Sequence, residues 1–222
     1  MNSNIDLIIF DFDGVLADSE TMGCQIWSDV FARHGMTVPA RDILEKYTGK
    51  TGTLICSLVE QEYGYHIPDG FLDEVNENTE AVMAKELKAV PGVLETMPVF
   101  DTPVCIASGS RPKRLNMCLD VTGLRPFFPE NTVFSSHFVK NGKPAPDLFF
   151  YAAEKMGAAP EKCLVIEDSS SGIIGAKAAG MKVFGFLGGS HCTPARGNQL
   201  KESGADLLFD DFTKLPDLLK KA

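Results

Sequence analysis

Short apolar runs recur along the chain, and each is separated from the next by an amphipathic segment. Unbroken apolar runs of this length are typical of strands buried on both faces of a parallel sheet, and the segments between them are typical of the helices that cover it. The predicted fold class is therefore α/β, with a doubly wound, mostly parallel sheet. The runs are residues 7–10, 104–107, 133–134, 163–166, 183–186 and 207–209.

The interval between the first two runs is much longer than the others. A crossover helix needs a dozen or more residues, whereas this interval extends from residue 11 to residue 103. Apolar residues at helical spacing predict three helices within it, of which one ends at Gly35, one ends before Gly64 and one covers residues 71–87. We therefore expect an inserted helical cap domain at residues 19–89, and a sheet domain made of residues 1–18 and 90–222.

The composition indicates a globular protein and limits its partners. Of the 222 residues, 44% are hydrophobic and 23% are charged, which is ordinary for a globular chain. The formal net charge of −9 disfavours nucleic acid and membrane surfaces as partners, because both are anionic. A small anionic substrate is still compatible, since a metal and a few cationic side chains act at shorter range. The expected assembly is a monomer or a small homo-oligomer.

The cysteines and the first residues bear on the compartment. The 6 cysteines form no CxxC pair and no cluster with zinc-ligand spacing. The chain begins without the basic segment and the apolar stretch of a signal peptide, and no apolar run is long enough to span a bilayer. These features predict a reduced, cytoplasmic protein.

Polar side chains follow the apolar runs where a doubly wound sheet binds its ligands, beyond the carboxyl ends of the strands. Asp11 and Asp13 follow the first run, and two carboxylates this close repel each other unless a cation or a shared proton lies between them. This edge therefore predicts a metal site or acid–base chemistry. The other residues expected there are Ser108, Gly109, Ser110 and Arg111 after the second run, Lys143 before the fourth, and Glu167 and Asp168 after the fourth.

Four segments, in chain order, resemble the motifs of the haloacid dehalogenase (HAD) superfamily. DFDGVLADSE is similar to the first motif of that family, ASGS to the second, GKPAPDLF to the third and VIEDSSSGIIGAKAAG to the fourth. The resemblance covers essentially the whole chain and is closest to the branch of phosphatases and β-phosphoglucomutase-like enzymes with a small helical cap. It implies a Rossmann-like core, the cap, and a phosphoric monoester hydrolase activity.

The resemblance also implies roles for the residues that match the motifs. Asp11 is the expected nucleophile that forms an aspartyl-phosphate, and Asp13 the expected acid and base for the leaving alcohol and the attacking water. Ser108 and Lys143 are expected to stabilise the transferring phosphoryl group. Oxygen ligands favour a hard cation, so the expected cofactor is Mg²⁺. Its expected ligands are Asp11, the backbone carbonyl of Asp13, Asp168, and Glu167 either directly or through water.

The substrate-binding residues are less sharply defined. Gly109, Ser110 and Arg111 precede a helix that opens at Pro112, where backbone N–H groups suit phosphate oxygens, although this segment alone is also typical of a turn. Lys50 is either a cap residue that reaches the substrate or a surface lysine. The stretch Ser190-His191-Cys192 either lines the pocket or forms a plain loop.

Two other functions are compatible with these residues. A phospho-accepting signalling module of receiver type also combines an acidic pair, a hydroxyl and a lysine, but its accepting aspartate follows a later strand. A β-phosphoglucomutase-like sugar-phosphate mutase shares all four motifs, but carries a histidine on the first cap helix where this chain has Gly23. We therefore expect a Mg²⁺-dependent phosphatase acting on a small phosphorylated metabolite, such as a sugar or polyol phosphate, with the mutase as the alternative.

Overall fold

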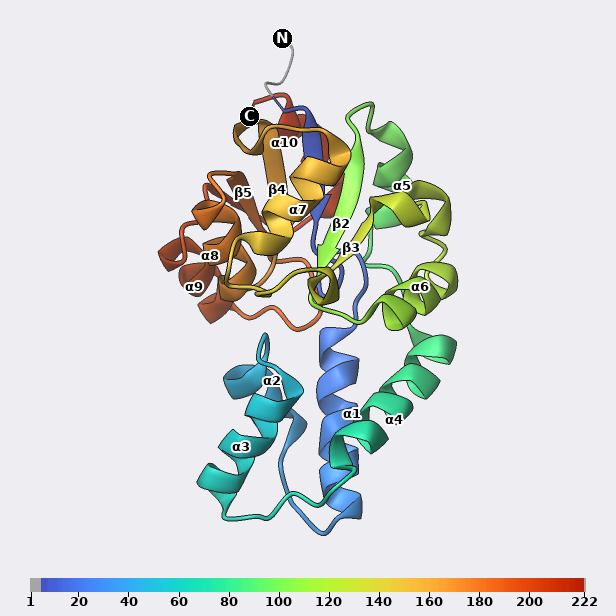
Figure 1. Ribbon diagram of the computed structural model, residues 1–222, viewed down its shortest axis with the longest axis vertical. Coiled ribbons are helices and arrows are strands. Elements are labelled where there is room, and N and C mark those ends of the chain that lie inside the picture. The colour runs from blue at the N-terminus through green and yellow to red at the C-terminus, as the bar shows by residue number, and fades with distance from the viewer. Residues whose placement is uncertain (1–4, 222) are drawn as a thin grey trace. The chain divides into compact units, whose positions relative to one another are not determined.

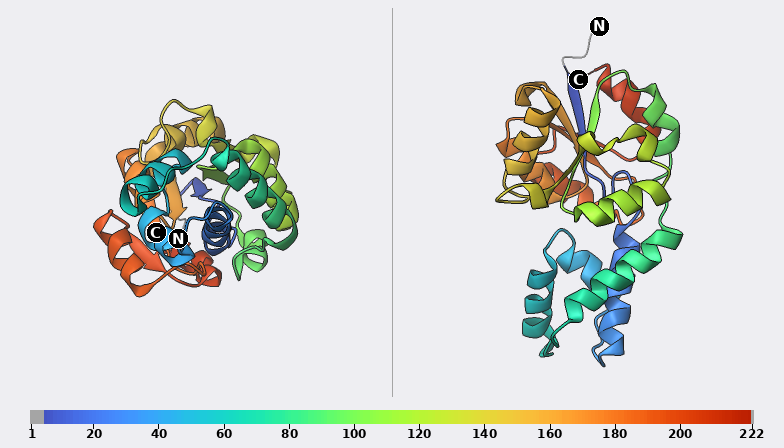
Figure 2. Two further views of the ribbon diagram at one scale, coloured as in Figure 1. Left: turned by 90° about the horizontal axis from the view of Figure 1, so that it is seen from below. Right: turned by 45° about the vertical axis from the view of Figure 1, so that its right-hand side comes forward.

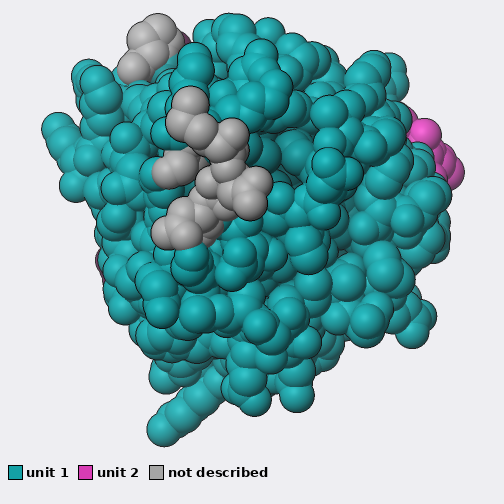
Figure 3. Space-filling view, turned by 90° about the horizontal axis from the view of Figure 1, so that it is seen from above, with its two compact units in different colours: residues 1–18, 88–222 teal, residues 19–87 magenta. Residues whose placement is uncertain are grey.

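The computed structural model describes residues 5–221, and the chain divides into two compact units. The larger unit comprises Met1–Asp18 and Lys88–Ala222, and the smaller unit comprises Ser19–Leu87 (Figure 3). The smaller unit ends at Leu87, two residues before the boundary that we expected at residue 89. In the described residues, no helix is both long enough and apolar enough to cross a membrane.

The larger unit is built on one six-stranded sheet in which every pairing is parallel, as the α/β prediction required. The strand order is β3-β2-β1-β4-β5-β6, so the chain starts at the centre and winds outward in both directions. The switch between the two directions lies between β1 and β4, where doubly wound sheets bind their ligands. The strands are β1 (Leu7–Phe10), β2 (Val104–Ser108), β3 (Val133–Ser135), β4 (Cys163–Glu167), β5 (Lys182–Phe186) and β6 (Leu207–Phe209).

Helices cover both faces of this sheet, as the right-hand view of Figure 2 shows. Successive strand residues point to opposite faces. Ile9 therefore packs in the core that includes Phe149 and Ile173, while Phe10 contacts aromatic rings on the other face, among them Phe212. The helices of this unit, labelled where there is room in Figure 1, are α5 (Val93–Thr96), α6 (Pro112–Val121), α7 (Asp147–Met156), α8 (Ser170–Ala178), α9 (Pro194–Glu202) and α10 (Leu215–Leu219).

The smaller unit is helical and has an apolar core of its own. Trp27 and Phe31 of one helix pack against Phe71 of another, with ring centroids 4.7 Å apart for Phe31 and Phe71. The helix predicted to end before Gly64 does so, and Gly64 adopts a left-handed conformation at its C-cap. The helices are α1 (Glu20–Arg33), α2 (Ala40–Tyr47), α3 (Gly52–Tyr63) and α4 (Phe71–Glu86), of which α2 was not predicted.

The two connections that lead out of the larger unit and back into it lie side by side. The backbone N–H of Val90 donates to the carbonyl of Leu16 at 2.9 Å, and the N–H of Asp18 donates to the carbonyl of Lys88 at 3.0 Å. Ala17 and Ala89 form an antiparallel bridge between these two hydrogen bonds. The larger unit therefore closes its own backbone across the point of insertion.

Candidate active site

The carboxyl ends of three neighbouring strands carry the residues predicted from the sequence. Phe10 of β1 lies opposite Ile106 of β2 and Ile166 of β4, so the residue after β1 lies between the ends of the other two strands. That residue is Asp11, which is 8% exposed. Ser108 ends β2, Glu167 ends β4 and Asp168 follows it. All three are buried.

Lys143 joins two of these strand ends. It comes from the segment between the short helix η4 (Ser136–Phe138) and α7, and its Nζ donates to Asp11 Oδ1 at 2.7 Å and to Glu167 Oε1 at 2.6 Å. Its side chain is 10% exposed. Burial disfavours the charged ammonium, but Asp11 and Glu167 outweigh that effect and raise the pKa of Lys143. The lysine is therefore a fixed positive charge between two carboxylates.

The site still holds more negative charge than Lys143 neutralises. Burial raises the pKa of the Asp11 carboxyl well above its ordinary value, Lys143 opposes this rise, and the nearby carboxylates of Glu167 and Asp168 add to it. Ligand atoms of Asp11, Glu167 and Asp168 all lie within 4.8 Å of one another. A group of carboxylate oxygens alone suits a hard divalent cation such as Mg²⁺. The acidic cluster therefore fits a metal centre.

The carboxylates of this cluster differ in how many of their oxygens accept hydrogen bonds from the protein. Glu167 Oε1 accepts from Lys143, and Oε2 accepts from the backbone N–H groups of Asp168 and Ser169 and from the Ser169 hydroxyl, at 2.8 to 3.0 Å. Asp11 Oδ2 and Asp168 Oδ1 receive no hydrogen bond from residues 5–221. The geometry thus leaves one oxygen on each aspartate for a cation or a substrate.

The start of α8 explains why Glu167 is held so firmly. Ser169 is the N-cap of that helix, and its hydroxyl accepts from the N–H of Gly172 at 3.1 Å while it donates to Glu167 Oε2. A Cβ at position 172 would lie 1.7 Å from Glu167 Oε1, so only glycine fits there. The glycine allows the helix to pack directly on the buried carboxylate.

Replacing Lys143 with methionine should lower the free energy of unfolding of the metal-free protein by about 3 kcal/mol, because Glu167 would stay buried without its cationic partner. Added Mg²⁺ should restore part of this loss, since a bound cation supplies positive charge to the same carboxylates. Urea unfolding with EDTA and with Mg²⁺ measures both effects. Lys140→Met, at an exposed lysine nearby, is the control, and an equal loss in that variant would contradict the prediction.

Asp13 is held by two side chains from the segment after β2. Ser110 Oγ donates to its Oδ2 at 2.6 Å, and Arg114 donates to its Oδ1 at 2.7 Å. Arg114 was not predicted; it lies in the first turn of α6, and only the fold brings this turn to Asp13. Ser110 is itself fixed, because its N–H donates to Ser108 Oγ at 3.1 Å and its carbonyl accepts from Ser135 Oγ at 2.7 Å.

The remaining predicted substrate-binding residues lie on the surface. Gly109 is exposed in the turn after β2, and Arg111 is exposed at the N-cap of α6, where Pro112 is the first helical residue. Lys50 is exposed between α2 and α3 in the smaller unit. Substrate binding by these three residues stays a prediction.

Asp168 has two partners: Arg196 was not predicted, and His191 belongs to the stretch 190–192, which the sequence left as either pocket lining or a plain loop. His191 Nε2 lies 2.8 Å from Asp168 Oδ2, and Arg196 Nε donates to the backbone carbonyl of Asp168 at 3.0 Å. Burial opposes the charged imidazole, but the hydrogen bond with Asp168 prevails and raises the pKa of His191 to about 10. Both residues follow β5, which is the neighbour of β4 in the sheet, and this adjacency is the signal that could have found them.

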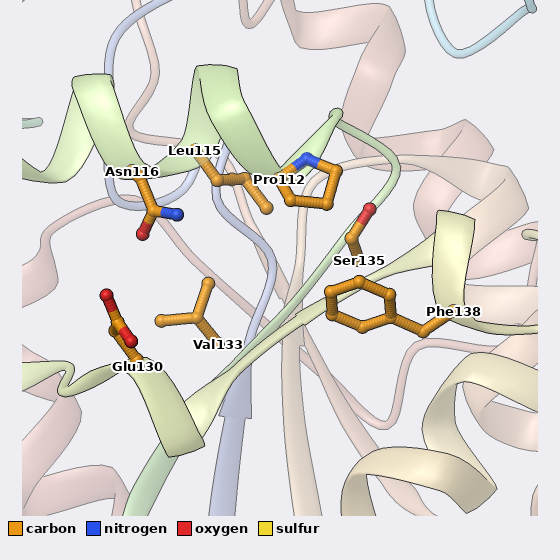
Figure 4. Close-up of a pocket in the computed structure, with 7 residues that line it drawn as sticks. All are labelled: Pro112, Leu115, Asn116, Glu130, Val133, Ser135 and Phe138. Carbon is orange, nitrogen blue, oxygen red and sulfur yellow. The ribbon is translucent and has the colours of Figure 1, made fainter.

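A separate pocket of about 250 Å³ opens beside α6 and β3 (Figure 4). Ser135 lines it and also supports Ser110, but neither a carboxylate of the acidic cluster nor Lys143 lies in its wall. The strand-end cluster, and not this pocket, therefore brings the predicted residues together. The pocket is lined by Pro112, Leu115, Asn116, Glu130, Val133, Ser135 and Phe138.

Residues 8–186 match the profile of the haloacid dehalogenase-like hydrolases. The chain belongs to that family. Among the family's curated members, the 6-phosphogluconate phosphatase of Escherichia coli is 26% identical over 98% of this chain and 96% of its own length. The fructose-1-phosphate phosphatase of the same organism is 30% identical over 78% of this chain and 92% of its own length. The chain is therefore an enzyme of the hydrolase class.

Solved structures of haloacid dehalogenase-like proteins share this fold. One of unknown function from Agrobacterium tumefaciens has a TM-score of 0.90 and 34% identity, covering 98% of both chains. A putative β-phosphoglucomutase from Thermotoga maritima has a TM-score of 0.79 and 26% identity, covering 98% of this chain and 100% of its own. The structural similarity thus extends to a mutase-like member of the family.

Proposed function

We propose that this haloacid dehalogenase-like enzyme is a phosphatase that hydrolyses a small phosphorylated sugar or polyol with Mg²⁺ at the acidic cluster. The observation that carries the proposal is the contact of Lys143 with Asp11, which fixes one oxygen of a buried carboxylate and leaves the other open toward a substrate. The names of the two curated relatives, which act on 6-phosphogluconate and on fructose 1-phosphate, support this substrate class.

The reaction proceeds in two displacements at phosphorus. Asp11 Oδ2 forms a bond to the phosphorus atom while the bond to the leaving oxygen breaks, and Asp13 gives its proton to that oxygen, so that an alcohol departs. Asp13 then takes a proton from water, whose oxygen attacks the phosphorus and releases phosphate together with the regenerated Asp11 carboxylate. Ser110 and Arg114 hold the Asp13 carboxylate in place through its two oxygens.

Positive charge is what the phosphoryl group needs as it approaches a carboxylate, because both are anionic. Lys143 supplies one such charge at a fixed position, and the Ser108 hydroxyl is a further expected donor. Asp11 and Asp168, the latter through its open Oδ1, would hold Mg²⁺, which when bound would supply positive charge to the reacting groups. Glu167, with both oxygens engaged, would act through water.

The sugar-phosphate mutase is the second candidate, because the putative β-phosphoglucomutase of Thermotoga maritima shares the fold over the whole chain. Gly23 argues against it. This residue lies inside α1, and a Cβ placed there would meet no described atom within 4 Å apart from its chain neighbours and the backbone of its own helix. A glycine offers no side-chain hydrogen bond, whereas the mutases carry a histidine at this position. Water is then the default acceptor for the phosphoryl group.

A phosphate-release screen over sugar phosphates, polyol phosphates and nucleotides with Mg²⁺ tests the proposal. We expect release from one of the first two groups. A second arm supplies β-glucose 1-phosphate with catalytic glucose 1,6-bisphosphate and follows free phosphate against glucose 6-phosphate. Glucose 6-phosphate that forms much faster than phosphate would establish the mutase instead, and no release from any compound would contradict the phosphatase.

A further inference from the structure

The loop between β5 and α9, residues 187–193, carries a buried histidine that the proposed mechanism does not use. The His191 side chain is 0% exposed. Its Nδ1 has no hydrogen-bond partner among residues 5–221, and its Nε2 faces Asp168 Oδ2 at 2.8 Å, with the Cys192 thiol 3.5 Å from the same nitrogen. The imidazole therefore contacts a carboxylate of the acidic cluster.

The contact with His191 makes the two Asp168 oxygens different, because one is engaged and the other is not. Oδ2 is engaged by His191, and the Arg196 guanidinium lies 3.6 Å from the same oxygen. Oδ1 receives no hydrogen bond from the described part of the chain. A carboxylate held at one oxygen cannot rotate freely, so the direction in which the other oxygen presents its lone pairs is fixed.

Two glycines leave the space that the His191 ring and the Asp168 carboxylate occupy. Gly14 has a φ of +80°, and a Cβ at this position would lie 2.3 Å from Asp168 Oδ2 and 2.9 Å from His191 Cε1. A Cβ at Gly189 would lie 2.6 Å from the same ring carbon. Two loops that are far apart in the sequence therefore omit side chains at the points where the ring and the carboxylate meet.

The loop is also anchored next to the histidine. Ser190 donates to Asp18 Oδ1 twice, from its backbone N–H at 3.1 Å and from its hydroxyl at 2.7 Å. Since this anchor precedes His191 directly, the backbone that carries the imidazole is fixed at a second point besides the ring itself.

We propose that His191 is a positioning residue for Asp168. It donates its Nε2–H to Oδ2 and thereby presents Oδ1 to the divalent cation. Hydrogen bonds of this kind to metal-binding side chains orient them, and their removal weakens metal affinity about 10-fold or more. The inference rests on the proposed function only in that Asp168 is taken as a metal ligand.

Isothermal titration calorimetry of the metal-free protein with Mg²⁺ alone tests this role without any turnover. His191→Leu fills the space without a donor and should weaken Mg²⁺ binding about 10-fold or more. His191→Gln keeps an N–H donor and should bind Mg²⁺ more tightly than the leucine variant. In assays, the leucine variant should need more Mg²⁺ for half-maximal rate and recover most of its kcat at saturating Mg²⁺. His66→Ala, at a histidine whose side chain is 94% exposed, is the control and should change nothing.

Several outcomes would overturn the inference. Unchanged Mg²⁺ affinity in His191→Leu would do so, and so would a loss in His191→Gln as large as that in His191→Leu. If the leucine variant fails to fold, the glutamine variant decides, because a loss of about 10-fold there would show that the donor alone does not support binding. Wild-type protein that binds Mg²⁺ but releases no phosphate from any substrate would contradict the proposed function and leave this inference intact.

Discussion

Replacing Asp11 with asparagine should lower kcat by about four orders of magnitude or more, while the protein stays folded. The amide keeps the shape of the carboxylate and can still accept a hydrogen bond from Lys143, but its oxygen is not a nucleophile toward phosphorus. Phosphate release under saturating substrate measures the loss, and thermal unfolding checks the fold.

Asp6→Asn provides the matched control. Asp6 is exposed just before β1, so this variant has the same chemical change without a place in the site. Its kcat should equal that of the wild type. An Asp11→Asn protein that retains a tenth of the wild-type kcat, after contamination by host phosphatases has been excluded, would show that the nucleophile is another group.

Removal of divalent metal should abolish turnover, and added Mg²⁺ should restore it. Ligand atoms of three carboxylates lie within 4.8 Å of one another, Lys143 contacts two of these carboxylates, and burial raises the pKa of Asp11. Without a further cation, Asp11 is held toward its protonated, unreactive form and an anionic phosphate is repelled. Assays after dialysis against EDTA, with and without excess Mg²⁺, measure the effect.

Asp168→Asn should raise the Mg²⁺ concentration needed for half-maximal rate, because it removes negative charge from one expected ligand. EDTA mixed with a molar excess of Mg²⁺ controls for effects of the chelator itself. Undiminished phosphate release in EDTA alone would contradict a metal-dependent reaction.

The strands and the main acidic residues were readable from the sequence because each rests on a local pattern. A parallel sheet covered on both faces buries its strands completely, so its strands stand out as apolar runs. The runs at residues 7–10 and 207–209 coincide with β1 and β6. Once the runs are ordered as a doubly wound sheet, the residues that follow them must share one edge, and Asp11 and Asp168 do so.

The features that were missed depend on contacts between distant segments or on weak local signals. Arg114 lies one turn inside a helix, and only the fold shows that this turn faces Asp13. His191 lies in a loop with no strand-like or helical period, so the sequence left residues 190–192 either in the pocket or in a plain loop; only the fold shows that its partner Asp168 lies on the neighbouring strand end. The helix α2 has only eight residues, of which Ile43 and Tyr47 alone are buried, so its apolar periodicity covers a single repeat.

The paired connections at residues 16–18 and 88–90 make the segment between them exchangeable. The backbone hydrogen bond from Asp18 to Lys88 brings the ends of the segment together within the sheet domain. The entropic cost of closing a loop grows only with the logarithm of its length, by about 0.6 kcal/mol for each doubling. Insertions, deletions or replacement of a whole cap at this point therefore leave Asp11 and Asp13 where they are. An exchange of the inserted segment would therefore leave the backbone of the sheet domain closed across the point of insertion.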